Sequence, residues 1–127
     1  MYRIVSKEML TPTICRMKVE ASRLASAALP GQFLIVRADE QGERIPLTIS
    51  DFDKDAGTVT IVTQKIGAST SEICSYEEGD SFSDVVGPLG IPSDFTEMSD
   101  EELAGKRYVF IAGGVGTAPV YPQVKWL

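Results

Sequence analysis

Apolar and polar residues alternate along much of the first two thirds of the chain, which predicts β structure. In residues 13–20, cysteine, methionine and valine alternate with arginine, lysine and glutamate, the period of a strand with one buried face. Similar apolar runs predict further strands at residues 2–7, 31–37, 44–51, 58–64 and 81–86. Many short strands separated by glycine, proline and aspartate turns indicate a mainly β fold, a closed antiparallel barrel that leaves no exposed sheet edge.

One helix interrupts this series of strands. Residues 71–76 read as a short helical stretch that is opened by Gly67-Ala68-Ser69-Thr70, and the spacing of Ser69 and Glu72 predicts a capping box. Residues 21–29 are small and only weakly helical before Pro30-Gly31, so they predict a loop or a single turn.

The pattern changes after residue 90. Residues 91–104 form an acidic stretch, and residues 107–112 are apolar without alternation, as in a parallel strand that is covered on both faces. A glycine turn at 113–119 and a helix start follow, which together are the opening of a nucleotide-binding α/β unit. Pro119 suits a first helical turn, whereas Pro122 has no such explanation.

This change divides the chain into two expected parts. Residues 1–98 are predicted to form the barrel, and residues 99–127 a linker with the first strand, turn and helix of an incomplete α/β domain. One strand and a short helix cannot make a doubly wound sheet, so we expect a fragment that ends inside the second lobe. The alternative is a naturally short protein in which this last segment packs on the barrel.

Charge narrows the classes of partner. The net charge of −6 and the isoelectric point near 4.6 argue against nucleic acid, which requires a concentrated basic surface. No secretory leader and no apolar run of membrane length is visible, so we expect no membrane contact and a cytoplasmic location.

The inventory of reactive side chains is small. With two cysteines and no histidine, the chain has neither the usual zinc ligands, nor four cysteines for a cluster of its own, nor a Ser-His-Asp triad. A Cys15–Cys74 disulfide and two reduced cysteines both remain open. Paired carboxylates fall in turns and in the acidic stretch, where they read as solvated loop charge. Chemistry in such a chain would depend on bound cofactors.

The stretch 44–50 is the most informative strand. An extended chain places Thr48 and Ser50 on one face, opposite the aliphatic residues 47 and 49. Pro46 has no N–H for a ladder, which predicts an open sheet edge. An open edge beside an arginine and a hydroxyl would seat a flat, phosphate-bearing ligand; the alternative is an ordinary amphipathic strand with a solvated arginine.

Two glycine-containing stretches share the logic of phosphate binding. Free amides and the partial positive charge at a helix N-terminus favour an anion, and glycine permits close backbone approach. Residues 67–70 and 113–119 both precede predicted helices. The alternative for the first is a capped helix after a turn, and glycines after a strand also occur without a nucleotide.

Taken in order, these motifs resemble the ferredoxin–NADP reductase superfamily. The segments "RIPLTISD", "GPLG" and "GGVGTAPVYP" are most similar to two relatives. One is the small flavin subunit of ferredoxin:NADP oxidoreductase, also called sulfide dehydrogenase, and the other is the electron-transfer subunit of dihydroorotate dehydrogenase. The resemblance covers the whole chain. It implies a six-stranded antiparallel Greek-key barrel that binds FAD, with NAD(P)H on the following α/β lobe.

The resemblance also implies roles for residues of the central strand. The family motif is R-x-Y-S/T, and Thr48 matches its hydroxyl position at the flavin N5 edge, the catalytic position. Leu47 takes the aromatic position, so the flavin would lie on an aliphatic side chain, with Pro46 beside it. The arginine position falls on Ile45, and Arg44, one residue early, is the expected phosphate contact.

Two further segments match the cofactor sites of the family. The FAD diphosphate segment corresponds to Gly67, Ala68, Ser69 and Thr70. The NAD(P) diphosphate turn corresponds to Gly113, Gly114, Val115, Gly116, Thr117, Ala118 and Pro119.

The implied reaction is hydride transfer from the nicotinamide to the flavin, followed by single-electron transfer to an iron–sulfur partner. That partner would be a ferredoxin or a larger catalytic or iron–sulfur subunit. Because Cys15 and Cys74 lack the required spacing, the ligands of any 2Fe–2S cluster would lie beyond Leu127, as would the residue that distinguishes NAD from NADP. The competing hypothesis is a non-catalytic acidic β-barrel interaction module.

Overall fold

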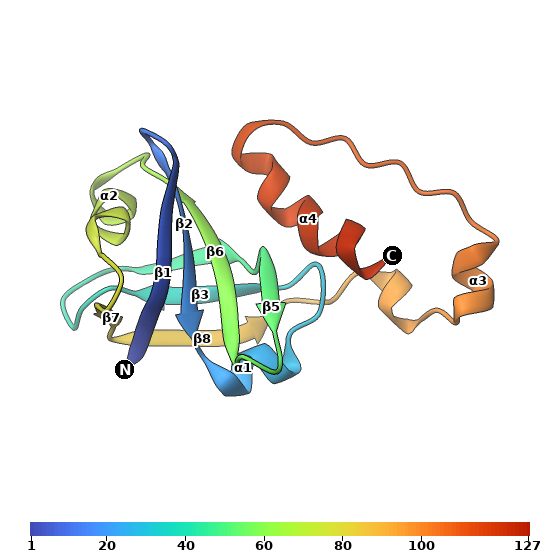
Figure 1. Ribbon diagram of the computed structural model, residues 1–127, viewed down its shortest axis with the longest axis horizontal. Helices are drawn as coiled ribbons and strands as arrows, with labels where there is room; N and C mark the ends of the chain where they lie inside the picture. Colours follow the sequence, from blue (N-terminus) through green and yellow to red (C-terminus); the bar gives the residue numbers. More distant parts are fainter.

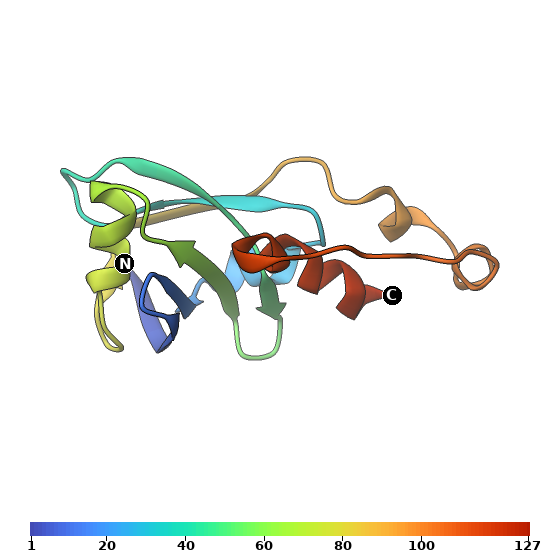
Figure 2. The same ribbon diagram turned by 90° about the horizontal axis from the view of Figure 1, so that it is seen from above.

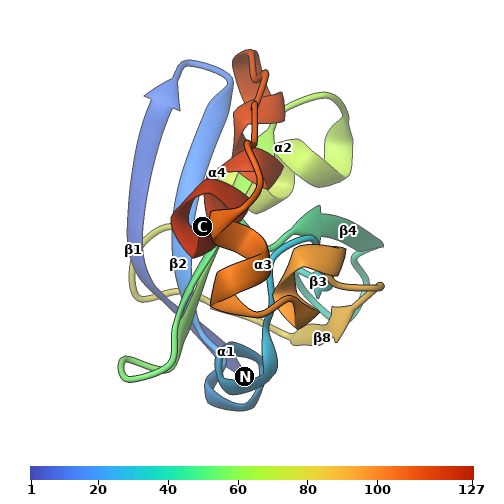
Figure 3. The same cartoon turned by 90° about the vertical axis from the view of Figure 1, so that its right-hand side faces the viewer.

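A computed structural model describes all 127 residues and shows a mainly β chain (Figure 1). The strands form two antiparallel sheets, one in the order β5-β6-β2-β1-β7 and one in the order β4-β3-β8. Their bounds are β1 Tyr2–Thr11, β2 Ile14–Glu20, β3 Phe33–Arg37, β4 Arg44–Thr48, β5 Asp51–Asp53, β6 Thr58–Gln64, β7 Ser81–Phe82 and β8 Asp84–Leu89. Figure 3 shows β1 and β2 on one side and β3, β4 and β8 on the other.

The alternating pattern of β2 is confirmed. This strand lies at the centre of the larger sheet, paired with β1 and with the whole of β6. Its side chains Cys15, Met17 and Val19 are at most 1% exposed, while their polar neighbours face outward. Because a fully buried apolar side chain of this kind contributes roughly 1.5–3 kcal/mol, such inward rows from both sheets supply most of the stabilisation.

The prediction of a closed barrel is wrong, because no hydrogen-bonded ladder joins the two sheets. Instead, the chain itself passes from one sheet to the other at a corner after β4. There the N–H of Ile49 donates to the carbonyl of Gln32 at 3.2 Å, and the N–H of Ser50 donates to the carbonyl of Thr60 in the larger sheet at 2.9 Å. A bend of this kind lets one strand serve two packed sheets.

A second corner follows β7. The N–H of Ser83 donates to the carbonyl of Arg37 at 3.1 Å, whereas Phe82 still pairs with Tyr2 of the larger sheet. The strands predicted at 44–51 and 81–86 are therefore each divided in two, and the second continues to Leu89. The mainly antiparallel β fold is confirmed, with two sheets in place of one closed ladder.

Short helices close the ends of the sheets and form the C-terminal part. They are α1 Ser22–Ala27, α2 Ala68–Ser75, η1 Asp94–Glu97, α3 Asp100–Ala104, η2 Gly114–Gly116 and α4 Thr117–Trp126. None of them has the length and apolar character that a membrane crossing requires. The short helix α1 occupies the stretch for which a loop or single turn was expected, and Leu24 and Ala25 bury it against the core.

The acidic stretch 91–104 contains more structure than a linker. It includes η1 and α3, and α3 has a complete capping box. The hydroxyl of Ser99 accepts from the N–H of Glu102 at 3.2 Å, and the carboxylate of Glu102 accepts from the N–H of Ser99 at 3.1 Å. The Ser-x-x-Glu spacing of residues 99–102 is the sequence signature of this box.

The parallel strand expected at 107–112 is not formed. Residues 106–113 run as an extended segment from α3 to η2, which Figure 2 shows as a nearly straight path. Val109 is 80% exposed and Ile111 is 92% exposed. A parallel strand needs a neighbouring strand for its hydrogen bonds, and none of the strands in the two sheets pairs with this segment.

Candidate functional site

Strand β4 lies at the edge of the smaller sheet. It pairs with β3 through all five of its residues, and its other side has no partner strand. Pro46 stands opposite Ile35 in the register and is exposed. The open edge that Pro46 predicted is confirmed, and it provides a straight border against which a flat molecule can lie.

Thr48 and Leu47 project from this edge in different directions. Leu47 and Ile45 pack against the core cluster, whereas Thr48, opposite Phe33, is half-buried at the end of the strand. Because neighbouring side chains of a strand face opposite ways, a flat ring can contact both residues only along the open edge. The geometry thus restricts how any ligand of this pair would lie.

Arg44 begins β4 and has an acidic partner within the protein. Its Nη1 donates to Oδ2 of Asp84 in β8 at 2.8 Å, and both side chains are partly exposed. An exposed pair of this kind contributes roughly 0–1 kcal/mol, so a phosphate competes for the guanidinium at little cost. The structure leaves Arg44 at the margin of the candidate site.

The segment 67–70 forms the start of α2, but its cap differs from the predicted one. Gly67 is the N-cap, and the hydroxyl of Thr70 accepts from the N–H groups of Ile66 at 2.9 Å and Gly67 at 3.1 Å. Glu72 does not take part in this cap. Burial, followed by the negative charge of Asp39, raises the pKa of the Glu72 carboxyl.

The first turn of α2 leaves its remaining amides available. The N–H groups of Ala68, Ser69 and Thr70 have no acceptor within the chain, as expected for N1 to N3 of a helix. The hydroxyl of Ser69 donates to Oε2 of Glu43 at 2.7 Å. A carboxylate therefore already lies at this helix N-terminus, where the helix dipole favours an anion.

This contact joins two of the motifs chosen from the sequence. Glu43 immediately precedes Arg44 of β4, and Ser69 lies 26 residues later in the first turn of α2. The start of the open edge and the free amides are therefore neighbours in space. Nothing in the sequence pattern singled out Glu43, because an acidic residue in a turn ordinarily reads as solvated.

The glycine turn 113–119 has the expected turn-to-helix form. η2 spans Gly114–Gly116, and α4 begins at Thr117 with Pro119 in its first turn. Gly114 has a φ of +56°, a left-handed conformation that glycine adopts without strain. The turn lies over β6, on the face of the larger sheet that points away from the core.

Pro122, for which the sequence offered no explanation, is matched by Ser50. A proline in a helix cannot donate to the carbonyl four residues earlier, here that of Ala118. The hydroxyl of Ser50 donates to this carbonyl at 3.0 Å. The corner after β4 therefore satisfies the acceptor that the proline leaves free, and it attaches α4 to the sheets.

A second contact holds the same helix. Nζ of Lys125 donates to Oδ1 of Asp51 in β5 at 2.8 Å, and this hydrogen bond raises the pKa of Lys125. Because Asp51 follows Ser50 directly, both attachments of α4 come from one corner of the β structure. The position of the glycine turn thus depends on residues close to Thr48.

A cavity of about 540 Å³ lies between the glycine turn and the outer face of the larger sheet. The turn contributes Gly114 and Val115, while β2 contributes the cations Arg16 and Lys18. Neither Thr48 nor the segment 67–70 lines it. The candidate residues therefore fall into two groups, β4 with α2 and the glycine turn with this cavity, linked by the corner at Ser50.

Comparisons with known proteins find relatives that match the chain along nearly its whole length. An uncharacterised protein of Clostridium beijerinckii, encoded in the adh 3′ region, is 57% identical over the whole chain. A Thermotoga maritima homologue of the electron-transfer subunit of dihydroorotate dehydrogenase B is 37% identical over 98% of the chain. The chain spans 43% and 42% of the lengths of these relatives. No family model matches the sequence.

Solved structures give the same picture. A structure of an NADH-dependent reduced ferredoxin–NADP oxidoreductase, studied for flavin-based electron bifurcation, matches with a TM-score of 0.86 and 35% identity, over 98% of this chain and 43% of the other. Phthalate dioxygenase reductase matches with a TM-score of 0.64, over 98% of this chain and 38% of that protein; at 18% identity, the likeness shows the fold alone.

Proposed function

Since the chain belongs to the ferredoxin–NADP reductase superfamily, we propose that it is the flavin-binding part of an NAD(P)H-dependent electron-transfer subunit. In this proposal, residues 1–98 bind FAD, and residues 99–127 begin the domain that receives NAD(P)H. The observation that carries the proposal is the hydrogen bond between Glu43 and Ser69, because it places the open edge of β4 beside the free amides of α2.

The residues present fit FAD. Two predicted contacts, a flat ring and a diphosphate, need an open strand edge and a cluster of free N–H groups, and both are available at neighbouring positions. The backbone amides of Ala68, Ser69 and Thr70 would hold the diphosphate. FAD, when bound, supplies the exchange between two-electron hydride chemistry and single-electron transfer.

The side chains of β4 would orient the ring. Thr48 would direct its hydroxyl to the reactive edge of the ring, and Leu47 would exclude water from the side of the core. Arg44 would contribute positive charge near the phosphates once its contact with Asp84 is exchanged. None of these residues is suited to general acid–base catalysis, so their task in this proposal is binding and orientation.

The glycine turn would receive the nicotinamide nucleotide. Residues 113–119 would present amides to its diphosphate, and the cavity between this turn and β2 offers space beside them. The electron acceptor in this proposal is a ferredoxin or an iron–sulfur or larger catalytic subunit, in line with the names of the relatives. The cytoplasmic location and a cluster bound beyond Leu127 remain predictions.

A flavin titration tests this proposal. The purified chain should quench the fluorescence of added FAD and give a saturable isotherm. Thr48→Val, which keeps the size of the side chain, should retain binding but alter the flavin absorption band, because it removes a hydrogen bond worth roughly 1 kcal/mol. Ser6→Ala on β1 serves as a control on the same fold.

The proposal fails if the folded chain shows no saturable binding of FAD after attempted reconstitution. Circular dichroism of the same sample establishes that the chain is folded. A folded, flavin-free chain would favour the alternative, an acidic interaction module that binds its partner irrespective of flavin.

A further inference from the structure

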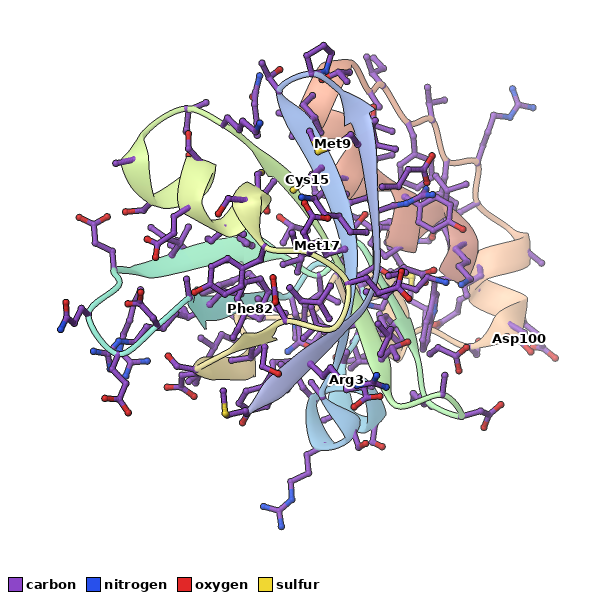
Figure 4. The ribbon with its side chains drawn as sticks, turned by 60° about the vertical axis from the view of Figure 1, so that its left-hand side comes forward. Arg3, Met9, Cys15, Met17, Phe82 and Asp100 are labelled. Carbon is purple, nitrogen blue, oxygen red and sulfur yellow. The ribbon has the colours of Figure 1, made fainter.

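Two buried thiols lie in contact between the larger sheet and α2. Cys15 is on β2 and Cys74 in the last turn of α2, and they are 0% and 2% exposed. Both are reduced, and Sγ of Cys15 donates a hydrogen bond to Sγ of Cys74 at 2.8 Å. Figure 4 shows Cys15 on β2 with α2 nearby. Nothing in the proposed flavin chemistry uses these sulfurs.

The two cysteines differ in their position relative to an open groove. An open groove lies beside the β1–β2 turn. Cys74, Lys7 and Lys65 line it, whereas Cys15 does not. The groove brings a small molecule to α2 at Cys74, whereas the fully buried Cys15 does not border it. This arrangement gives the pair an outer and an inner member.

The side chain of Lys7 lies beside Cys74. Nζ of Lys7 donates to the carbonyl of Cys74 at 2.6 Å and to Oε1 of Glu77 at 3.0 Å, and its side chain is only 10% exposed. Burial, reinforced by the hydrogen bond to Cys74, raises the pKa of the Cys15 thiol to about 12, and the charge of Lys7 opposes this shift. Cys15 therefore stays protonated at neutral pH. Because Cys74 is the member of the pair that lines the groove, it is the sulfur that a reagent meets first.

A metal site does not explain the pair. No group of three or more cysteine, histidine, aspartate or glutamate side chains is placed to hold a metal ion. The hydroxyl of Thr63, which pairs with Cys15 in the ladder, is the one buried side-chain oxygen without a hydrogen-bond partner. The pair of sulfurs therefore has no third ligand with which to hold a metal ion.

We propose that Cys15 and Cys74 are a redox-active dithiol that a peroxide closes to an intramolecular disulfide. In the first step, the sulfur of Cys74 attacks one oxygen of hydrogen peroxide and the O–O bond breaks. Cys74 becomes a sulfenic acid, and the other oxygen leaves as water. In the second step, the sulfur of Cys15 attacks that of Cys74 and the hydroxyl leaves as a second water. Two thiols and one hydrogen peroxide thus give one disulfide and two waters.

The disulfide would fix α2 to β2 with little rearrangement. A disulfide bond is about 2.05 Å long, so the sulfurs need to approach by less than about 1 Å. The cross-link closes a loop between residues 59 apart in sequence, a long loop whose closure restricts the unfolded chain strongly. Oxidation should therefore raise the melting temperature by roughly 10 °C.

The test uses the whole chain, freed of reductant and treated with a small excess of hydrogen peroxide. Under denaturing conditions, the count of free thiols should fall from two to zero, and dithiothreitol should restore both. A non-reducing peptide map should link the peptides of Cys15 and Cys74 within one chain. Unmodified thiols under conditions that oxidise the exposed Met1, or a disulfide between two chains, would overturn the proposal.

Single variants test the order of the two steps. In Cys15→Ser, dimedone should trap a stable sulfenic acid on Cys74, because the second sulfur is absent. In Cys74→Ser, the remaining Cys15 should stay unreacted. Equal reactivity of the two single thiols would refute the assignment of an outer and an inner sulfur.

Lys7 offers a further readout. Lys7→Met should slow disulfide formation about fivefold because it removes the positive charge beside Cys74, and Lys7→Arg should restore the rate because it keeps that charge. The melting temperature of each reduced variant shows whether the fold is intact. This inference does not depend on flavin binding, so it stands or fails separately from the proposed function.

Discussion

Replacing Glu43 with glutamine should tighten FAD binding while lowering the stability of the ligand-free chain slightly. Oε2 of Glu43 accepts from the hydroxyl of Ser69 at 2.7 Å, at the helix N-terminus where the diphosphate would lie. In the free chain, the carboxylate gains about 0.3–1 kcal/mol from the helix dipole. In the complex, the same carboxylate would face the two negative charges of the diphosphate.

The magnitude follows from screened electrostatics. Glu43 and Ser69 are exposed or half-buried, so the dielectric constant of water is the appropriate one. At a separation of about 5 Å, one pair of like unit charges then repels by about 0.8 kcal/mol. Two phosphate charges give about 1.5 kcal/mol, and partial movement of the side chain away from the site reduces this. A net effect of about 0.5–1.5 kcal/mol corresponds to a Kd that is about 2- to 13-fold lower.

The assay is a fluorescence titration of FAD at low and high ionic strength. Since about 1 M salt shortens the screening length to about 3 Å, the gain of Glu43→Gln should largely disappear there. Glu40→Gln is the matched control, because it removes the same charge from the same turn and its carboxylate makes no contact with α2. Equal affinities of the two variants at low salt, or weaker binding by Glu43→Gln, would refute the assignment of the diphosphate to α2.

Two further predictions concern hydrogen bonds that hold α2 and α4 in place. Thr70→Val should lower the free energy of unfolding by about 1–2 kcal/mol in urea, because it removes the acceptor of two N–H groups, while Thr70→Ser should retain most of it. Ser50→Ala should leave the carbonyl of Ala118 without a donor, so the amides of α4 should exchange hydrogen faster while those of β2 stay unchanged. Unchanged unfolding in the first case, or unchanged exchange in the second, would contradict the corresponding contact.

The sequence predicts well what depends on a local pattern. The alternation in β2 determines which side chains are buried, because a strand has only two faces and one of them meets the core. The missing N–H of Pro46 likewise determines that β4 is an edge strand. Both predictions rest on the chemistry of the residue itself and need no knowledge of distant neighbours.

The sequence predictions fail where contacts with residues distant in the sequence determine the local structure. The residues around Ser50 continue the strand pattern of β4, but the carbonyl of Thr60 draws the chain into the other sheet. Residues 107–112 have the composition of a covered strand. They do not form one, because no strand of the two sheets lies beside them to accept and donate the ladder hydrogen bonds. In α2, the predicted box at Ser69 and Glu72 is displaced by two residues, because the hydroxyl of Thr70 reaches two N–H groups at once.

The corner after β4 also explains why two hydroxyls that are two residues apart have different partners. Thr48 ends the open edge of the smaller sheet, whereas Ser50 is 5% exposed and is held by the backbone of the larger sheet and of α4. Because the chain changes sheets between them, their common face in an extended strand is lost. The short path from Thr48 to Ser50 therefore joins the proposed flavin edge to the helix that carries the glycine turn. Pro122 has no N–H to donate to the carbonyl of Ala118 within α4. This carbonyl is therefore free to accept the hydrogen bond from Ser50.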